Sequence, residues 1–175
     1  MPALKSFFLT LLLASCLSHG SSAVAQEQTP TCSGAGFEDF DFWIGHWTVH
    51  TMDGALAGEN LITRQENNCL ILEHWTSTTG TTGQSYNFYN PVSERWRQIW
   101  ISDGSIIDLE GGLTDGGAMH LEGEIIYTKT GKTYPFTGLW TPLPDGSVRQ
   151  EFEQFDPESE FWGDWFTGIY TRKAQ

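Results

Sequence analysis

The chain first becomes strand-forming at Phe40-Asp41-Phe42-Trp43-Ile44-Gly45-His46-Trp47. From there to its end, short runs rich in Val, Ile, Thr, Tyr, Phe and Trp alternate with turn signals, and no run of helical period exceeds about two turns. We therefore predict an all-β domain over residues 37–175. Residues 37–42 precede the first strand, and we expect a short helical turn there that plugs one end of the fold.

Turn-forming residues separate the strand-like runs and set their order. They are Asp53-Gly54, Asn90-Pro91, Asp103-Gly104, Asp115-Gly116, Gly131 and Asp145-Gly146. Between them lie about ten predicted strands, at residues 43–51, 58–66, 70–78, 84–90, 95–102, 106–113, 118–127, 133–141, 147–155 and 164–173. Tight turns connect antiparallel neighbours, and closing such a meander removes its exposed edges. We predict a single antiparallel up-and-down β-barrel, wide enough to keep a cavity.

Several short motifs make the chain resemble a known class of barrel. Gly45-x-Trp47 on the first strand, with Arg172 on the last, resembles the Gly-x-Trp signature of lipocalins and other calycins. In those folds the Trp closes one barrel end and a cation of the last strand stacks over its ring. The wider pattern is similar to an uncharacterised bacterial calycin-like (lipocalin-like) domain family, whose marks are Phe-Trp-Ile-Gly-x-Trp at 42–47, Leu72-Glu73-His74-Trp75, Ser85-x-Asn87-x-Tyr89-Asn90-Pro91, Trp96-x-Gln98-x-Trp100, Leu109-Glu110-Gly111-Gly112-Leu113 and Trp140-Thr141-Pro142-Leu143-Pro144-Asp145-Gly146. This resemblance implies a calycin-like fold and no particular activity.

The N-terminal segment has the layout of an export signal. Lys5 precedes an apolar run at 7–13, and small residues follow up to Ala23-Val24-Ala25. The apolar run is too short for a permanent transmembrane helix. We predict a signal peptide at 1–25 and a flexible leader at 26–36, which makes the domain periplasmic or secreted.

A second reading of this segment stays open. Leu13-Ala14-Ser15-Cys16 resembles the lipobox of bacterial lipoproteins, in which the cysteine is lipidated and anchors the chain. A lipid anchor at Cys16 would place the domain on a membrane surface without inserting it. Either reading puts the domain outside the cytoplasm.

Two cysteines remain in the exported domain, Cys32 and Cys69. An even pair in an oxidising compartment predicts one disulfide, with two unpaired thiols as the alternative. Two thiols alone cannot fill a tetrahedral metal site, and no Cys-x-x-Cys occurs. His46 and His50 lie about 13 Å apart along one strand, too far to share a metal. We predict no metal and no cofactor; neither His74 nor His120 is assigned as a haem ligand.

The net charge of the chain excludes some classes of binding partner. The chain carries 9 basic and 22 acidic residues, a formal net charge of −13. Such a chain is repelled by nucleic acid and by anionic lipid surfaces. Solubility is the simplest consequence, and the charge alone predicts no cationic partner.

Polar and aromatic side chains alternate on two neighbouring predicted strands. Each strand places three of them on one face: Ser85, Asn87 and Tyr89 on one, Trp96, Gln98 and Trp100 on the other. A packed core would use aliphatic residues there, because a buried polar group without a partner costs about 1–3 kcal/mol. Either these groups hydrogen-bond one another across the strands, or they face a cavity and bind a ligand or water.

Glu73 is the candidate acidic residue, on the same strand face as Trp75. Among aromatic residues, burial would raise the pKa of Glu73 and make it a ligand hydrogen-bonding group or an acid/base group. The alternative is a buried ion pair with one of three arginines, Arg64, Arg97 or Arg149. Glu110 is a weaker candidate of the same kind, next to glycines that indicate a bend.

We predict that the barrel binds a small apolar or amphipathic molecule in a cavity of several hundred Å³. Its expected binding residues are Glu73, Trp75, Ser85, Asn87, Tyr89, Trp96, Gln98, Trp100 and Glu110. One alternative is a small-molecule enzyme with Glu73 as acid/base group, assisted by Tyr89 or Glu110. Another is a structural envelope module without a ligand, which requires a packed barrel and an exposed apolar patch.

Overall fold

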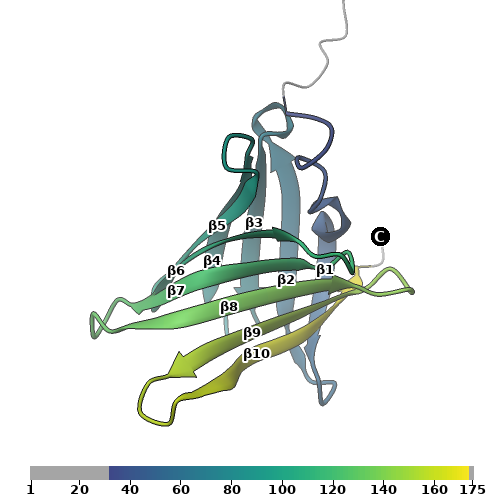
Figure 1. Ribbon diagram of the computed structural model, residues 1–175. Coiled ribbons are helices and arrows are strands. Elements are labelled where there is room, and N and C mark those ends of the chain that lie inside the picture. The colour runs from purple at the N-terminus through teal and green to yellow at the C-terminus, as the bar shows by residue number, and fades with distance from the viewer. Residues whose placement is uncertain (1–31, 174–175) are drawn as a thin grey trace, which may run out of the picture.

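Ten antiparallel strands close into one barrel in the computed structural model, which describes residues 32–173 (Figure 1). The strands are β1 (Gly45–Thr51), β2 (Leu56–Gln65), β3 (Leu70–Ser77), β4 (Thr82–Asn90), β5 (Arg95–Ser102), β6 (Ser105–Leu113), β7 (Met119–Tyr127), β8 (Thr133–Pro142), β9 (Val148–Asp156) and β10 (Phe161–Arg172). Each strand pairs with its neighbour in sequence, and β10 returns to β1. The predicted up-and-down barrel is confirmed, and every strand ends within 3 residues of its predicted boundary.

The contact between β1 and β10 closes the barrel. Trp47 is paired with Arg172 in the register of these strands. The guanidinium of Arg172 lies 4.4 Å from the centre of the Trp47 ring, and its Nη1 donates a hydrogen bond to the carbonyl of Ile44 at 3.2 Å. A Cβ at Gly45 would lie 2.6 Å from that Nη1, so a glycine here leaves room for the guanidinium.

A plug formed by residues 34–43 fills the barrel end next to the start of β1. Its 3-10 helix, η1 (Asp41–Trp43), begins later than the helical turn predicted at 37–42, because residues 35–40 form turns instead. Phe40 and Trp43 are fully buried and stack with ring centroids 4.9 Å apart. Both rings also pack on Trp140 of β8, at 5.3 and 5.7 Å. The three-residue spacing places both side chains on the barrel side of this tight turn.

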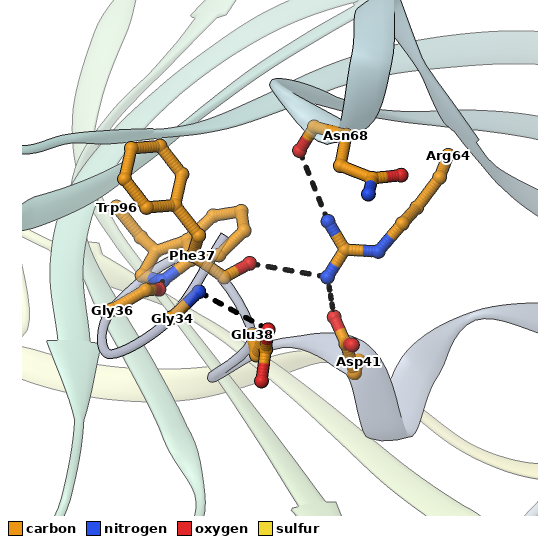
Figure 2. A network of polar contacts seen from close by, with 8 residues as sticks. All are labelled: Gly34, Gly36, Phe37, Glu38, Asp41, Arg64, Asn68 and Trp96. Atoms are coloured by element: carbon orange, nitrogen blue, oxygen red, sulfur yellow. Dashed lines mark hydrogen bonds and ion pairs between the residues drawn. The ribbon is translucent and has the colours of Figure 1, made fainter. Parts of the chain in front are cut away.

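Hydrogen bonds fix the plug to the barrel wall (Figure 2). Arg64 of β2 donates to the carbonyls of Phe37 and Asn68, at 3.1 and 3.0 Å, and forms an ion pair with Asp41. On the opposite side, Trp96 of β5 donates its indole N–H to the carbonyl of Gly36 at 2.9 Å. The plug is therefore held to both sides of this barrel end.

A disulfide joins Cys32 to Cys69, as predicted. Cys69 follows the short 3-10 helix η2 (Glu66–Asn68) between β2 and β3, so the disulfide ties the start of the plug to the same barrel end. A disulfide of this kind suggests an oxidising, extracytoplasmic compartment. The predicted signal peptide, lipobox and most of the leader lie outside the described residues. None of the described helices is long and apolar enough to span a membrane.

The other barrel end carries the β1–β2, β3–β4, β5–β6, β7–β8 and β9–β10 hairpins. In Figure 1 the β7–β8 and β9–β10 hairpins extend well beyond the rest of the barrel. We call this the open end and the plugged end the closed end. The candidate site lies between them, nearer the open end.

Candidate functional site

A cavity of about 190 Å³ lies inside the barrel. Aromatic side chains form most of its wall, together with Ile107: Trp75, Trp100, Phe152, Trp165 and Phe166. Three polar side chains complete the lining: Glu73, Gln150 and Tyr170. Trp75, Trp100 and Trp165 also border a wider hollow of about 980 Å³ among the hairpins of the open end. The cavity therefore lies beneath a broad mouth.

Glu73 is the acidic group of this cavity. It is 5% exposed, and each carboxylate oxygen accepts one hydrogen bond, from the amide of Asn60 at 2.6 Å and from the hydroxyl of Ser85 at 2.5 Å. The strand register places these donors on either side of it, on β2 and β4. Burial raises the pKa of Glu73 to about 7, although both hydrogen bonds act to lower it.

No arginine neutralises Glu73 within residues 32–173. Arg64 pairs with Asp41 at the closed end. Arg97 pairs with Asp108 at 2.6 Å, and Arg149 pairs with Glu151 at 2.9 Å. The ion pair considered as the alternative for Glu73 is thus absent from the described structure, and its carboxyl group faces a cavity instead.

A chain of hydrogen bonds leads from β5 to Glu73. Gln98 donates its amide N–H to the Asn87 side-chain oxygen at 2.7 Å, and Asn87 donates to the Ser85 hydroxyl at 2.8 Å. Asn87 also donates to the carbonyl of Ile71 at 3.1 Å, which fixes the orientation of its amide. Ser85 then directs its own hydrogen to Glu73. We call Gln98, Asn87 and Ser85 the polar ladder; these side chains hydrogen-bond one another inside the barrel and do not line the cavity.

The remaining candidates from the sequence lie elsewhere. Tyr89 and Trp96 pack against the plug at the closed end, with Tyr89 5.1 Å from Phe37 between ring centroids. Glu110 has an exposed side chain on the outer face, near Arg95 and Arg97. Of the nine predicted binding residues, the structure brings Glu73, Trp75 and Trp100 to the cavity.

Two polar residues of the cavity were not among the candidates. Gln150 is 3% exposed, and its amide has no hydrogen-bond partner among the described residues; its Oε1 is fully buried. The hydroxyl of Tyr170 lies 3.4 Å from the Asn60 amide nitrogen, and burial raises the pKa of Tyr170 well above its usual value. Gln150 and Phe152 lie two residues apart on β9, as Ser85 and Asn87 do on β4. The same alternation that selected the β4 residues could therefore have selected Gln150 as an inward-facing polar residue.

A β-bulge explains two further cavity residues. The register between β9 and β10 shifts between Asp164 and Phe166, which leaves Trp165 as an extra residue. Trp165 and Phe166 consequently both border the cavity although they are adjacent in sequence. Strict alternation would place them on opposite faces, so no simple sequence pattern reveals this pair.

Comparison of the chain with models of known protein families and with curated proteins finds no match. The closed antiparallel barrel of ten strands is consistent with a calycin-like fold. Within residues 32–173, no group of three or more His, Cys, Asp or Glu side chains could hold a metal ion.

Proposed function

We propose that this protein is an exported barrel that holds a small apolar or amphipathic molecule in its cavity. The observation that carries the proposal is the cavity of about 190 Å³, which has mostly aromatic walls and three polar side chains in its lining. Ligand sites are commonly apolar hollows in which a few polar groups fix the orientation of the ligand. The disulfide supports export, because such bonds persist in oxidising compartments.

The size of the cavity limits the ligand. An apolar cavity of about 150 Å³ accommodates benzene. The cavity here, at about 190 Å³, is somewhat larger and continues into the mouth beside Trp75, Trp100 and Trp165. The proposed ligand therefore places one ring and a short substituent inside, and any longer part extends toward the open end.

The first test blocks the cavity with a single methyl group. A Cβ at Gly83 would lie 2.1 Å from the Trp100 ring, so Gly83→Ala should push this ring into the cavity. Titration with the neutral fluorescent probe N-phenyl-1-naphthylamine should show binding to the unmodified protein and at least tenfold weaker binding to the variant. Native mass spectrometry of protein purified from its own host should show a bound small molecule.

Gly112→Ala is the matched control. It adds the same methyl group to a strand glycine, but no atom lies within 4 Å of the new Cβ. The control should bind the probe like the unmodified protein. Equal binding by both variants, with circular dichroism showing both folded, would place the probe outside the cavity and contradict the proposal.

An enzyme is the second candidate function. A carboxyl group with a pKa near 7, in a cavity and without a neutralising arginine, is suited to take up and release protons. Tyr89 and Glu110 lie away from the cavity, so Glu73 would act without them. Loss of turnover in Glu73→Gln with unchanged affinity for a neutral ligand would favour an enzyme over a binding protein.

A further inference from the structure

The polar groups around Glu73 are arranged for its ionised form. The ladder runs in one direction, because Gln98 donates to Asn87, Asn87 donates to Ser85 and Ser85 donates to Glu73. Asn60 donates to the second carboxylate oxygen. Chains of aligned hydrogen bonds strengthen one another in a low-dielectric interior. The carboxylate therefore has donors on both oxygens.

The positive charge that such a site requires is missing. A buried carboxylate is normally paired, since an isolated buried ion is costly. The side chains next to Glu73 are Asn60 on β2, Ser85 on β4 and Tyr170 on β10, and Trp75 on β3 and Gln150 on β9 line the same cavity. Of these only Tyr170 titrates, and among the described residues no lysine, arginine or histidine lines the cavity.

The lining provides hydrogen-bond acceptors for a donor group. The amide of Gln150 is buried, lines the cavity and has no partner among the described residues, and rotation about its last torsion lets it present its oxygen. The Tyr170 hydroxyl is a further acceptor. An alkylammonium group has three N–H donors. Glu73, Gln150 and Tyr170 match that number.

The aromatic wall also suits a cation. Trp75, Trp100 and Trp165 border both the cavity and the mouth. Indole faces attract cations, and more strongly where the pair is desolvated. The net charge of −13 would additionally favour the approach of a cation over that of an anion.

We propose that the cavity selects a protonated aralkyl amine, whose ammonium group binds Glu73, Gln150 and Tyr170 while its ring lies among Trp75, Trp100 and Trp165. This inference rests on the proposed function, because it names the ligand class of the same cavity. Ser85 is a positioning residue in this proposal: it contacts Glu73 and not the ligand.

Three probes of nearly equal shape test the proposal by calorimetry on the mature chain at pH 7.5. Benzylamine is a cation, benzyl alcohol is a neutral donor and benzoate is an anion. We expect benzylamine to bind at least tenfold more tightly than benzyl alcohol, and benzoate to bind most weakly. Glu73→Gln should bring benzylamine and benzyl alcohol to equal affinity.

Glu122→Gln is the matched control for charge. Glu122 is 71% exposed on the outer face, so this variant changes the net charge equally without touching the cavity. It should keep the preference for benzylamine. An equal loss of preference in both variants would assign the selectivity to overall charge and overturn the proposal.

The pH profile separates ionisation of Glu73 from a merely structural role. The preference for benzylamine requires the carboxylate, so its affinity should fall by up to about tenfold for each pH unit below about 7 until it equals that of benzyl alcohol, whose affinity should not change. Ser85→Ala removes one donor to the carboxylate and should move the midpoint of this profile to higher pH. An unmoved midpoint would contradict the role of the ladder.

The outcomes distinguish the two proposals. Equal binding of benzylamine and benzyl alcohol to the unmodified protein would overturn the amine proposal and leave the binding function standing. Preferential binding of benzoate would do the same. Absence of binding by all three probes, and by N-phenyl-1-naphthylamine, would overturn both.

Discussion

The two ends of the barrel use the same kinds of side chain for different purposes. At the closed end, Phe40, Trp43 and Trp140 are fully buried and pack on one another. Toward the open end, Trp75 and Trp100 are only half-buried and border a cavity. A tryptophan therefore marks neither a core nor a ligand site by itself.

The plug accounts for the difference. Residues 34–43 bring two aromatic rings into the closed end and are held there by Arg64, Trp96 and the disulfide. Among the described residues no comparable segment enters the open end. The barrel is wide enough to require filling, and the chain fills one end only, so the space left at the other becomes the candidate site.

The largest contrast is expected between Trp140→Ala and Trp100→Ala. Removing the buried Trp140 leaves a void among rings and should lower the free energy of unfolding by about 3–5 kcal/mol. Trp100 already borders empty space, so its removal should cost about 2 kcal/mol or less. Urea denaturation followed by circular dichroism measures both. Equal losses would mean that the open end is as tightly packed as the closed end.

Removal of the disulfide should act on the closed end alone. Cys32 and Cys69 are 37 residues apart in sequence, and loss of a link of this length costs roughly 2–4 kcal/mol. The double variant Cys32→Ser and Cys69→Ser should therefore unfold at lower urea concentration. Its affinity for N-phenyl-1-naphthylamine should stay within twofold of the unmodified protein. A large loss of affinity would show that the plug also shapes the cavity.

The titration of Glu73, in the cavity near the open end, should make the free energy of unfolding depend on pH. Its pKa is about 7 in the folded chain and 4.5 for an ordinary glutamate, so between these values the folded chain keeps a proton that the unfolded chain has lost. Raising the pH through this window favours unfolding, by about 3 kcal/mol in total, with a plateau above pH 7.

Glu73→Gln removes this dependence. The amide retains most of the shape without the charge, so the variant should be more stable than the unmodified protein at pH 8 and about equal to it at pH 4.5. Urea denaturation at a series of pH values measures the free energy of unfolding of both proteins. Subtracting one series from the other cancels the contributions of the other titrating groups. A difference that does not vary with pH would show that Glu73 titrates normally.

The sequence predicts the barrel better than it predicts the site. Turn residues such as Asp53-Gly54 act locally, and strand alternation reports which side chains face inward, so the strands could be placed to within a few residues. Alternation also grouped Ser85, Asn87 and Gln98 correctly on inward faces. Alternation does not tell how far along the barrel axis a residue lies. For that reason Tyr89 and Trp96, which pack at the closed end, were grouped with Trp100.

Other features depend on three-dimensional context that local patterns do not carry. The bulge at Trp165 adds a residue to the cavity wall. Tyr170 comes near Asn60 and Glu73 only because the last strand pairs with the first. Glu110, like Glu73, is a carboxylate in the middle of a strand-forming run, yet its side chain lies on the outer face. Which face of β6 turns inward is decided by its pairing with β5 and β7.

The smallest expected effect concerns the closure of the barrel at Trp47. Arg172 is exposed, and a cation over an indole at such a site contributes about 0.5–1 kcal/mol. Arg172→Ala should lower the free energy of unfolding by about 1 kcal/mol, because it removes both the contact with the Trp47 ring and the hydrogen bond to the carbonyl of Ile44. Arg172→Lys keeps the charge but not the planar stacking group, so its free energy of unfolding should lie between those of the unmodified protein and Arg172→Ala. Lys129→Ala is the control, since Lys129 has no ion pair within residues 32–173 and should change stability little. If Arg172→Ala matched this control, β1 and β10 would be held together by their backbone hydrogen bonds and by the burial of Trp47 alone.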